Sequence, residues 1–198
     1  MGLYGIGQPV PREEDPRLLQ GRGRYVDDVK LPREARGFML RSPHAHAKVK
    51  SVDVGKARQS PGVLAVLTAE DVKKRGLGTL RPALPRKRRD GSPGYVCPHP
   101  LLAIDRVRYV GQPVAFVVAE TLDQAKDAAG LIEVDYEVLT AVVSAVDAVK
   151  PGAVKVWDDN PSNEAFFHEV GDKAAVDAEF AKAAKIVKHS IGKISKLR

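Results

Sequence analysis

Residues 108–137, RYVGQPVAFVVAETLDQAKDAAGLIEVDYE, contain signals for a strand, a helix and a second strand in succession. The valine-rich run at residues 114–119 follows a proline and precedes polar residues, which is typical of a strand covered on both faces. Thr121 and Gln124 have the capping-box spacing, in which two side chains satisfy backbone N–H groups at a helix start. Gly130 marks the predicted helix end, because a residue without Cβ tolerates the left-handed conformation found there.

The second strand of this stretch is expected to be half buried. From Leu131 onward the hydrophobic period is two, so neighbouring side chains point to opposite faces. The apolar positions are Ile132, Val134, Tyr136 and Val138, and the acidic positions between them are Glu133, Asp135 and Glu137.

Shorter signals of the same kind occur on the N-terminal side. Apolar runs predict further strands, and turn residues predict short helices, one of them through the helix-start spacing of Thr68 and Asp71. The predicted strands are residues 37–40, 48–54 and 63–67, and the predicted helices are residues 55–60 and 69–75. Residues 1–16 are rich in glycine, proline and charge, and are expected to lie extended against a partner or to fray.

The C-terminal quarter has a different pattern. Residues 141–149 fit a helix or a strand, and residues 157–163, WDDNPSN, have the composition of a linker. Asp172 is placed to cap a core-facing helix. Its predicted apolar stripe is Val176, Phe180, Ala183 and Val187.

Composition restricts the class of protein. The 198 residues are 43% hydrophobic and 29% charged, as in one globular domain or one domain plus a fragment of another. The single cysteine, Cys97, cannot form an internal disulfide and has no metal-ligand spacing, so a packing role is favoured. No apolar run is long enough to cross a bilayer, and a cytoplasmic location is expected.

The formal net charge is +7, and its densest cluster is Arg81 with Arg86, Lys87, Arg88 and Arg89. A basic balance favours polyanionic partners. The cluster, however, lies in a stretch with many prolines and glycines, residues 81–100, which predicts a loop and not a helix that enters a groove. A solvated loop is therefore favoured over nucleic-acid contact, and contact with an acidic neighbouring subunit stays open.

His44 and His46 are the first candidates for chemistry. Two residues apart on a strand, their imidazoles would face the same way and so suit one metal ion. No third ligand is evident and Pro43 suggests a turn, so histidines bonded to the backbone are favoured. The other three histidines, His99, His168 and His189, are isolated in the sequence.

The remaining candidates are acidic or polar turns. Glu13, Glu14 and Asp15, and separately Asp27 with Asp28, are candidate ligands for a hard cation, although each cluster supplies too few ligands alone. Gln112 is a candidate cofactor contact, but a turn that positions the following strand is the simpler explanation and is favoured. The sequence has no nucleophile elbow, dinucleotide-binding glycine triplet or phosphate loop.

Four segments of the sequence resemble those of a known protein family. They are REEDPRLLQGRGRYVDD from Arg12, RSPHAHAKV from Arg41, PGVLAVLTAEDV from Pro61 and RYVGQPVAFVVAET from Arg108. With IEVDYEVL and WDDNPSN they cover nearly the whole chain. They resemble the amino-terminal region of the large subunits of molybdenum hydroxylases, the xanthine dehydrogenase and aldehyde oxidase family, and most closely the aerobic carbon monoxide dehydrogenase branch.

The resemblance implies an α+β fold, namely an α/β hammerhead domain with a mixed sheet and short helices, followed by a linker and a C-terminal helix. It assigns residues 1–150 to the hammerhead domain with its N-terminal extended arm. Residues 151–198 would be a linker and the start of the molybdopterin-binding domain. The terminal KHSIGKISKLR departs from the family pattern, and we expect that the chain is cut from a longer polypeptide.

The parent enzyme would hold molybdenum on a molybdopterin cytosine dinucleotide and pass electrons to iron–sulfur and FAD-containing partner subunits. The glycine-rich cofactor loops and catalytic residues of the family lie downstream of the hammerhead region. The resemblance therefore assigns no catalytic residue and no metal ligand here, and leaves cofactor contacts unknown. The isolated chain is expected to contain no cofactor and to be inactive.

Three hypotheses follow from the sequence. The favoured one is a structural N-terminal domain of a molybdenum-dependent oxidoreductase that contacts the rest of the large subunit. The second is a free-standing interaction module that uses the helix around Phe180. The third is a basic nucleic-acid binder that uses residues 86–89, whose binding would weaken steeply with salt.

Overall fold

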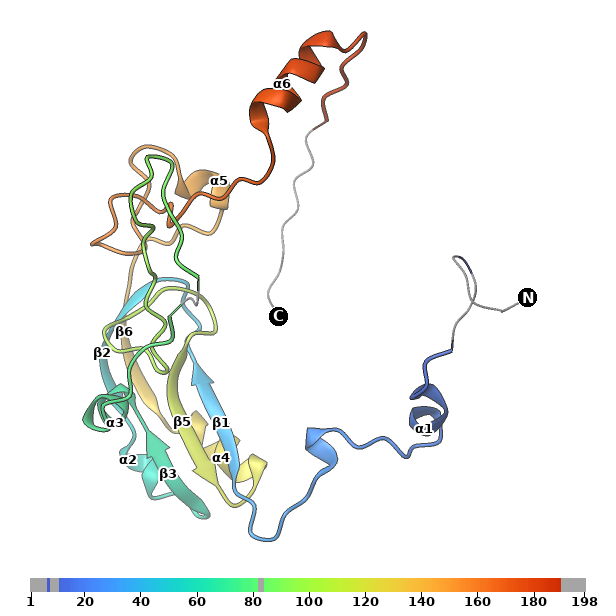
Figure 1. Ribbon diagram of the computed structural model, residues 1–198. Coiled ribbons are helices and arrows are strands. Elements are labelled where there is room, and N and C mark those ends of the chain that lie inside the picture. Colours follow the sequence, from blue (N-terminus) through green and yellow to red (C-terminus); the bar gives the residue numbers. More distant parts are fainter. Residues whose placement is uncertain (1–6, 8–10, 82–83, 190–198) are drawn as a thin grey trace. The chain divides into compact units, whose positions relative to one another are not determined.

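The computed structural model describes residues 7, 11–81 and 84–189 (Figure 1). Most of the predicted N-terminal arm and the terminal residues 190–198 lie outside this described part. The chain divides into two compact units. The first contains Met1–Leu80 and His99–Val143, and the second contains Arg81–Pro98 and Ser144–Arg198.

The first unit is built on a three-stranded sheet whose central strand is the predicted valine-rich one. The sheet order is β1-β5-β3, and both pairings are antiparallel. The strands are β1 (Arg36–Arg41), β5 (Pro113–Ala119) and β3 (Val63–Leu67). Four of the seven residues of β5 are buried, as expected for a strand enclosed by its neighbours.

A second three-stranded sheet contains the strand predicted to be half buried. Its order is β4-β2-β6, again antiparallel. The strands are β4 (Arg106–Val107), β2 (Ala47–Asp53) and β6 (Glu133–Val138). The family resemblance implied a mixed sheet, whereas every strand pair in the described residues is antiparallel. Strand direction depends on long-range pairing, which no local pattern encodes.

Helix α4 (Leu122–Gly130) covers one face of the first sheet and contacts all three of its strands. Its predicted capping box is confirmed: the Gln124 N–H donates to Thr121 Oγ1 over 3.2 Å, and the Thr121 N–H donates to Gln124 Oε1 over 3.0 Å. The helix ends at Gly130, as predicted, but not through a left-handed glycine. Gly130 is the last helical residue and has no positive φ, and Leu131 caps the helix with φ −91°.

The core of this unit lies between α4 and β5. Ala125 and Ala128 of α4 are fully buried, as are Ala115, Val117 and Ala119 of β5. Their small size lets the helix lie close to the sheet. A second buried cluster joins Val114 to Ala47, Ala103 and Val107 at the beginning of β5.

Short helices complete the unit. Both helices predicted from turn and cap signals are present, as α2 (Gly55–Arg58) and α3 (Ala69–Lys74). Before the first strand come α1 (Asp15–Leu19) and a 3-10 turn, η1 (Val26–Asp28), neither of which contains a buried residue.

The second unit has little regular structure. It contains α5 (Ala145–Ala148), so four of residues 141–149 form a short helix and none forms a strand, and it contains α6 (Lys173–Lys182). Asp172 caps α6 as predicted, accepting from the Ala175 N–H over 2.9 Å. The predicted stripe is only partly right: Ala183 is the C-cap in an extended conformation, so the helix ends before Val187.

The α+β fold class is confirmed.

One close approach in the first sheet is testable. A Cβ at Gly37 of β1 would lie 2.4 Å from Cζ of Phe116, whose ring covers the glycine. We predict that Gly37→Ala lowers the free energy of unfolding by about 1–3 kcal/mol, because the ring must move. Urea denaturation measures this.

Gly78→Ala is the matched control, because a Cβ there meets nothing within 4 Å and its φ is ordinary. It should be neutral or slightly stabilising. Equal stability of the two variants would show that the Phe116 ring does not restrict the side chain at residue 37.

Candidate functional site

The two candidate metal-binding histidines have separate structural roles. His46 is 7% exposed, and its Nδ1 lies 2.8 Å from the Thr140 carbonyl oxygen. Because a carbonyl only accepts, Nδ1 carries the proton and donates. Nε2 is buried without a hydrogen-bond partner. The His46 side chain therefore links the residue before β2 to the chain that follows β6. This confirms for His46 the prediction of a histidine bonded to the backbone.

His44 lies in the turn between β1 and β2. Its backbone N–H donates to Ser42 Oγ over 3.0 Å, and that hydroxyl is 3.1 Å from the His44 carbonyl oxygen. The imidazole packs edge-on against Tyr136 with ring centroids 4.9 Å apart. Burial raises the pKa of Tyr136. Within residues 7, 11–81 and 84–189, no three histidine, cysteine or acidic side chains group as a metal site would require.

The acidic turns are used for local structure. Asp28 accepts from the Tyr25 N–H over 2.9 Å and so closes the 3-10 turn, and the Asp27 carbonyl accepts from Lys30. Asp15 begins α1 and is the acidic residue of its first turn.

Gln112 is explained by its turn. It is 4% exposed, and its Oε1 accepts from the Arg108 N–H over 2.7 Å. Its backbone carbonyl accepts from the Ser42 N–H over 2.9 Å. Gly111 before it has φ +88°, which favours glycine. The turn positions β5 beside the end of β1. This is the turn explanation that the sequence analysis gave for Gln112.

Cys97 is a partly buried free thiol in the second unit. Burial raises its pKa, with a smaller contribution from Asp159. A raised pKa disfavours the nucleophilic thiolate, which fits a packing role.

The basic run is a solvent-exposed loop, as predicted, but it also packs against another segment of its unit. Arg88 Nη2 donates to Oδ1 of the buried Asn160 over 2.7 Å, and the Arg89 guanidinium lies 3.9 Å from the Phe167 ring centroid. Arg86 contacts His168 over 3.3 Å and lies over the Phe166 ring. Through these contacts, residues 86–94 pack against residues 160–168. The linker prediction for WDDNPSN missed this packing, because a turn-like composition does not reveal a buried asparagine.

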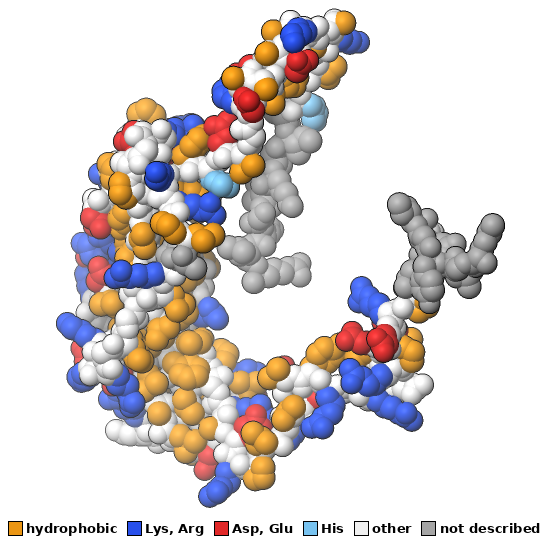
Figure 2. All heavy atoms as spheres, viewed as in Figure 1, with side chains coloured by type: hydrophobic (Ala, Val, Ile, Leu, Met, Phe, Trp, Pro, Cys, Tyr) orange, Lys and Arg blue, Asp and Glu red, His pale blue; other side chains and the backbone are white. Residues whose placement is uncertain are grey.

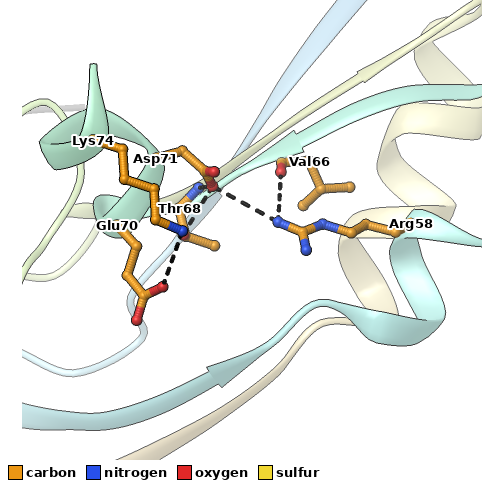
Figure 3. A network of polar contacts seen from close by, with 6 residues as sticks. All are labelled: Arg58, Val66, Thr68, Glu70, Asp71 and Lys74. Atoms are coloured by element: carbon orange, nitrogen blue, oxygen red, sulfur yellow. Dashed lines mark hydrogen bonds and ion pairs between the residues drawn. The ribbon is translucent and has the colours of Figure 1, made fainter.

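The first unit contains a polar network at the start of α3 (Figure 3). Asp71 Oδ2 accepts from the Thr68 N–H over 2.9 Å and from the Thr68 hydroxyl over 3.0 Å. Arg58 Nη2 lies 3.7 Å from the same oxygen and 3.4 Å from the Val66 carbonyl oxygen. The Thr68 N–H lowers the pKa of Asp71, aided by the Thr68 hydroxyl and Arg58.

A cavity of about 270 Å³ lies beside this network. Its lining combines valines and alanines of the strands and turns with a few charged and hydroxyl groups. The polar members are Lys50, Ser51, Arg58, Thr68 and Glu70. The sequence predicted the pairing of Thr68 with Asp71 but not the approach of Arg58, which depends on how α2 packs on β3. The network connects α2, β3 and α3 through Arg58, Val66 and Asp71.

Comparisons with known proteins identify the family of the chain. Residues 20–140 match the a/b hammerhead domain of aldehyde oxidase and xanthine dehydrogenase. The chain therefore belongs to this family, and the elements from η1 to β6 lie within the matched residues.

Particular relatives narrow the comparison. The chain is 42% identical over 198 residues to the carbon monoxide dehydrogenase large chain of Afipia carboxidovorans, covering 94% of this chain and 23% of that one. It is 38% identical over 149 residues to the nicotine 6-hydroxylase large subunit of Paenarthrobacter nicotinovorans, covering 75% and 18%. The crystal structure of a Cu,Mo-CO dehydrogenase superposes with a TM-score of 0.67 at 40% identity, covering 92% and 23%.

The chain thus spans about a quarter of the length of the curated relatives that it matches over most of its own length. Two relatives are named as a large subunit and as a subunit of a dehydrogenase complex, and the solved structure is that of a Cu,Mo-CO dehydrogenase. In the described part of the chain, no helix is long and apolar enough to cross a membrane.

The Asp71 network predicts a pH effect. Because the pKa of folded Asp71 is lowered, its stabilising contribution is complete above the unfolded pKa of about 3.9 and is lost as pH falls through the folded pKa. Asp71→Asn should therefore lose about 0.5–1 kcal/mol of stability at pH 7, and a progressively smaller amount as the pH falls below the unfolded pKa. Urea denaturation across this pH range measures the difference.

Glu70→Gln is the control in the same helix turn. The Glu70 side chain is 84% exposed and reaches Lys74 only at 4.0 Å, so its removal should change stability little across the same pH range. A pH-independent effect of Asp71→Asn would contradict the electrostatic role of Asp71.

The Arg88 contact predicts a structural effect of the basic run. Arg88→Gln removes the guanidinium from Asn160, which is 3% exposed. Leaving a buried acceptor unpaired costs about 1–2 kcal/mol. When local unfolding of residues 157–167 precedes cleavage, chymotrypsin should therefore cut this segment about 5- to 30-fold faster in the variant. Lys87→Gln, at an exposed neighbour, should leave the rate unchanged. Equal rates would show that Arg88 is dispensable.

Proposed function

We propose that this chain is the N-terminal structural part of the large subunit of a molybdenum hydroxylase of the carbon monoxide dehydrogenase type. The observation that carries the proposal is the 42% identity to a carbon monoxide dehydrogenase large chain across 94% of this chain. The match extends beyond residues 20–140, the family's hammerhead domain, and includes the second unit.

The side chains support a scaffolding role. Among the candidate residues, His46, Asp28, Gln112 and Arg88 are each hydrogen-bonded within their own turn or unit. We propose that none of them catalyses the reaction and that none binds a metal. Residues 1–150 would form the hammerhead domain and its arm, and residues 151–198 the linker and the beginning of the molybdopterin-binding domain.

The cofactors and partners belong to the same proposal. The parent enzyme would bind molybdenum on a molybdopterin cytosine dinucleotide in the remainder of the large subunit. Separate iron–sulfur and flavin subunits would carry the electrons, and the complex would work in the cytoplasm. The substrate would be set by residues outside this chain.

Two other functions have less support. A nucleic-acid interface at residues 86–89 would compete with the contacts of Arg86, Arg88 and Arg89 to Phe166, Asn160 and Phe167. An interaction module is favoured only by α6, whose Val176 and Phe180 are 51% and 55% exposed.

A chimeric enzyme tests the proposal. Residues 1–198 replace the matching part of the Afipia carboxidovorans large chain, which is co-expressed with the other subunits of that enzyme. We predict that the chimera assembles and binds molybdenum near the parental content, because the scaffold is interchangeable. Metal analysis of the purified complex measures this.

The same large chain with that region deleted is the control and should fail to accumulate. A chimera that folds but remains without molybdenum, while the parental enzyme is loaded, would contradict the proposal.

A further inference from the structure

The side of the first sheet that faces away from α4 carries apolar side chains. In antiparallel pairs, directly opposed residues share a face. Phe116 opposes Met39 and Leu67, while Val118 opposes Gly37 and Ala65. The alternate set, which includes Val117 and Val66, faces α4 and is buried. We call Met39, Ala65, Leu67, Phe116 and Val118 the open face.

The open face belongs to neither buried cluster. All five side chains are partly exposed, and none packs against the two cores. Only the beginning of the same side is covered, where Val114 is fully buried against Ala47, Ala103 and Val107. In Figure 1 α4 passes behind β1 and β5, and in Figure 2 hydrophobic side chains gather over these strands.

The outer side of the second sheet is different. There Lys48 and Lys50 pair with Glu137, and Lys56 pairs with Glu133, at N–O distances of 2.8, 3.5 and 2.6 Å. Such exposed pairs suit contact with water. The same unit therefore has one charged solvent face and one uncharged apolar face. An apolar sheet face normally packs on another layer.

We infer that the open face docks on an apolar surface of the molybdenum-binding part of the same large-subunit polypeptide. The inference rests on the proposed function and adds which face makes the contact. The partner surface must be uncharged, because a charge buried on this face would meet no counter-charge among its five side chains.

The size of the open face argues for a covalently linked partner. Three strands about 4.8 Å apart and five residues long give an area of roughly 250 Å². A stable contact between separate molecules needs about 800 Å² per partner. Two parts of one chain meet at millimolar effective concentration, so a smaller contact suffices. The relatives carry the matching region in a chain about four times as long.

Cysteine labelling tests the inference. Ala65→Cys adds only a sulfur to the open face, and Met39→Cys is a second probe on another strand. Asp135→Cys, on the exposed outer side of β6, is the control. Maleimide labelling of each site is followed by peptide mass spectrometry, both in the 198-residue chain and in the chimeric enzyme.

We expect labelling at residues 65 and 39 to be about tenfold slower in the chimera than in the chain alone, with residue 135 unchanged. Equal labelling in a chimera that retains molybdenum would overturn the inference and leave the proposed function intact. Protection that rises with concentration in the chain alone would overturn it in favour of a second copy. A chimera that labels rapidly at all sites and lacks molybdenum would contradict both.

Discussion

The contact between β5 and α4 is the constraint on which the first unit depends. Ala125, Ala128 and Ala129 of the helix are at most 2% exposed, and they pack on Ala115, Val117 and Ala119 of the strand. Alanine on both sides brings the backbones close together, so there is no room for a larger side chain. Because β5 is the central strand, its position also fixes β1 and β3 through backbone hydrogen bonds.

The polar contacts secure the connections around this core. Gln112 holds the turn before β5, His46 joins the first residues of β2 to the chain after β6, and Asp71 joins α3 to the end of β3. Each of these residues was a candidate for chemistry or a cap signal in the sequence. Their hydrogen-bonding groups bind backbone atoms of neighbouring turns, which is how a domain keeps its loops in place. This is the physical basis for assigning the chain a scaffolding role inside a larger enzyme.

Local signals predicted the elements well and their arrangement poorly. The valine run, the capping box at Thr121 and the alternation after Leu131 place β5, α4 and β6, because each depends on residues within one turn or strand. The antiparallel pairings, the approach of Arg58 to Asp71 and the packing of Phe116 over Gly37 depend on residues far apart in the sequence. Gly130 ends α4 as predicted, but it does not adopt the left-handed conformation expected there, and Leu131 caps the helix. The family motifs predicted the fold where local patterns could not, whereas the contacts of the arginines with residues 160–168 became visible only in the structure.

Native-state amide hydrogen exchange tests most directly the claim that β5 on α4 organises the first unit. The amides of residues 115–118 should exchange only through global unfolding and be the slowest of this unit, with those of β2 and β6 exchanging sooner. If the amides of β5 exchanged faster than those of β2 and β6, the second sheet would be the stable nucleus and the account would be contradicted.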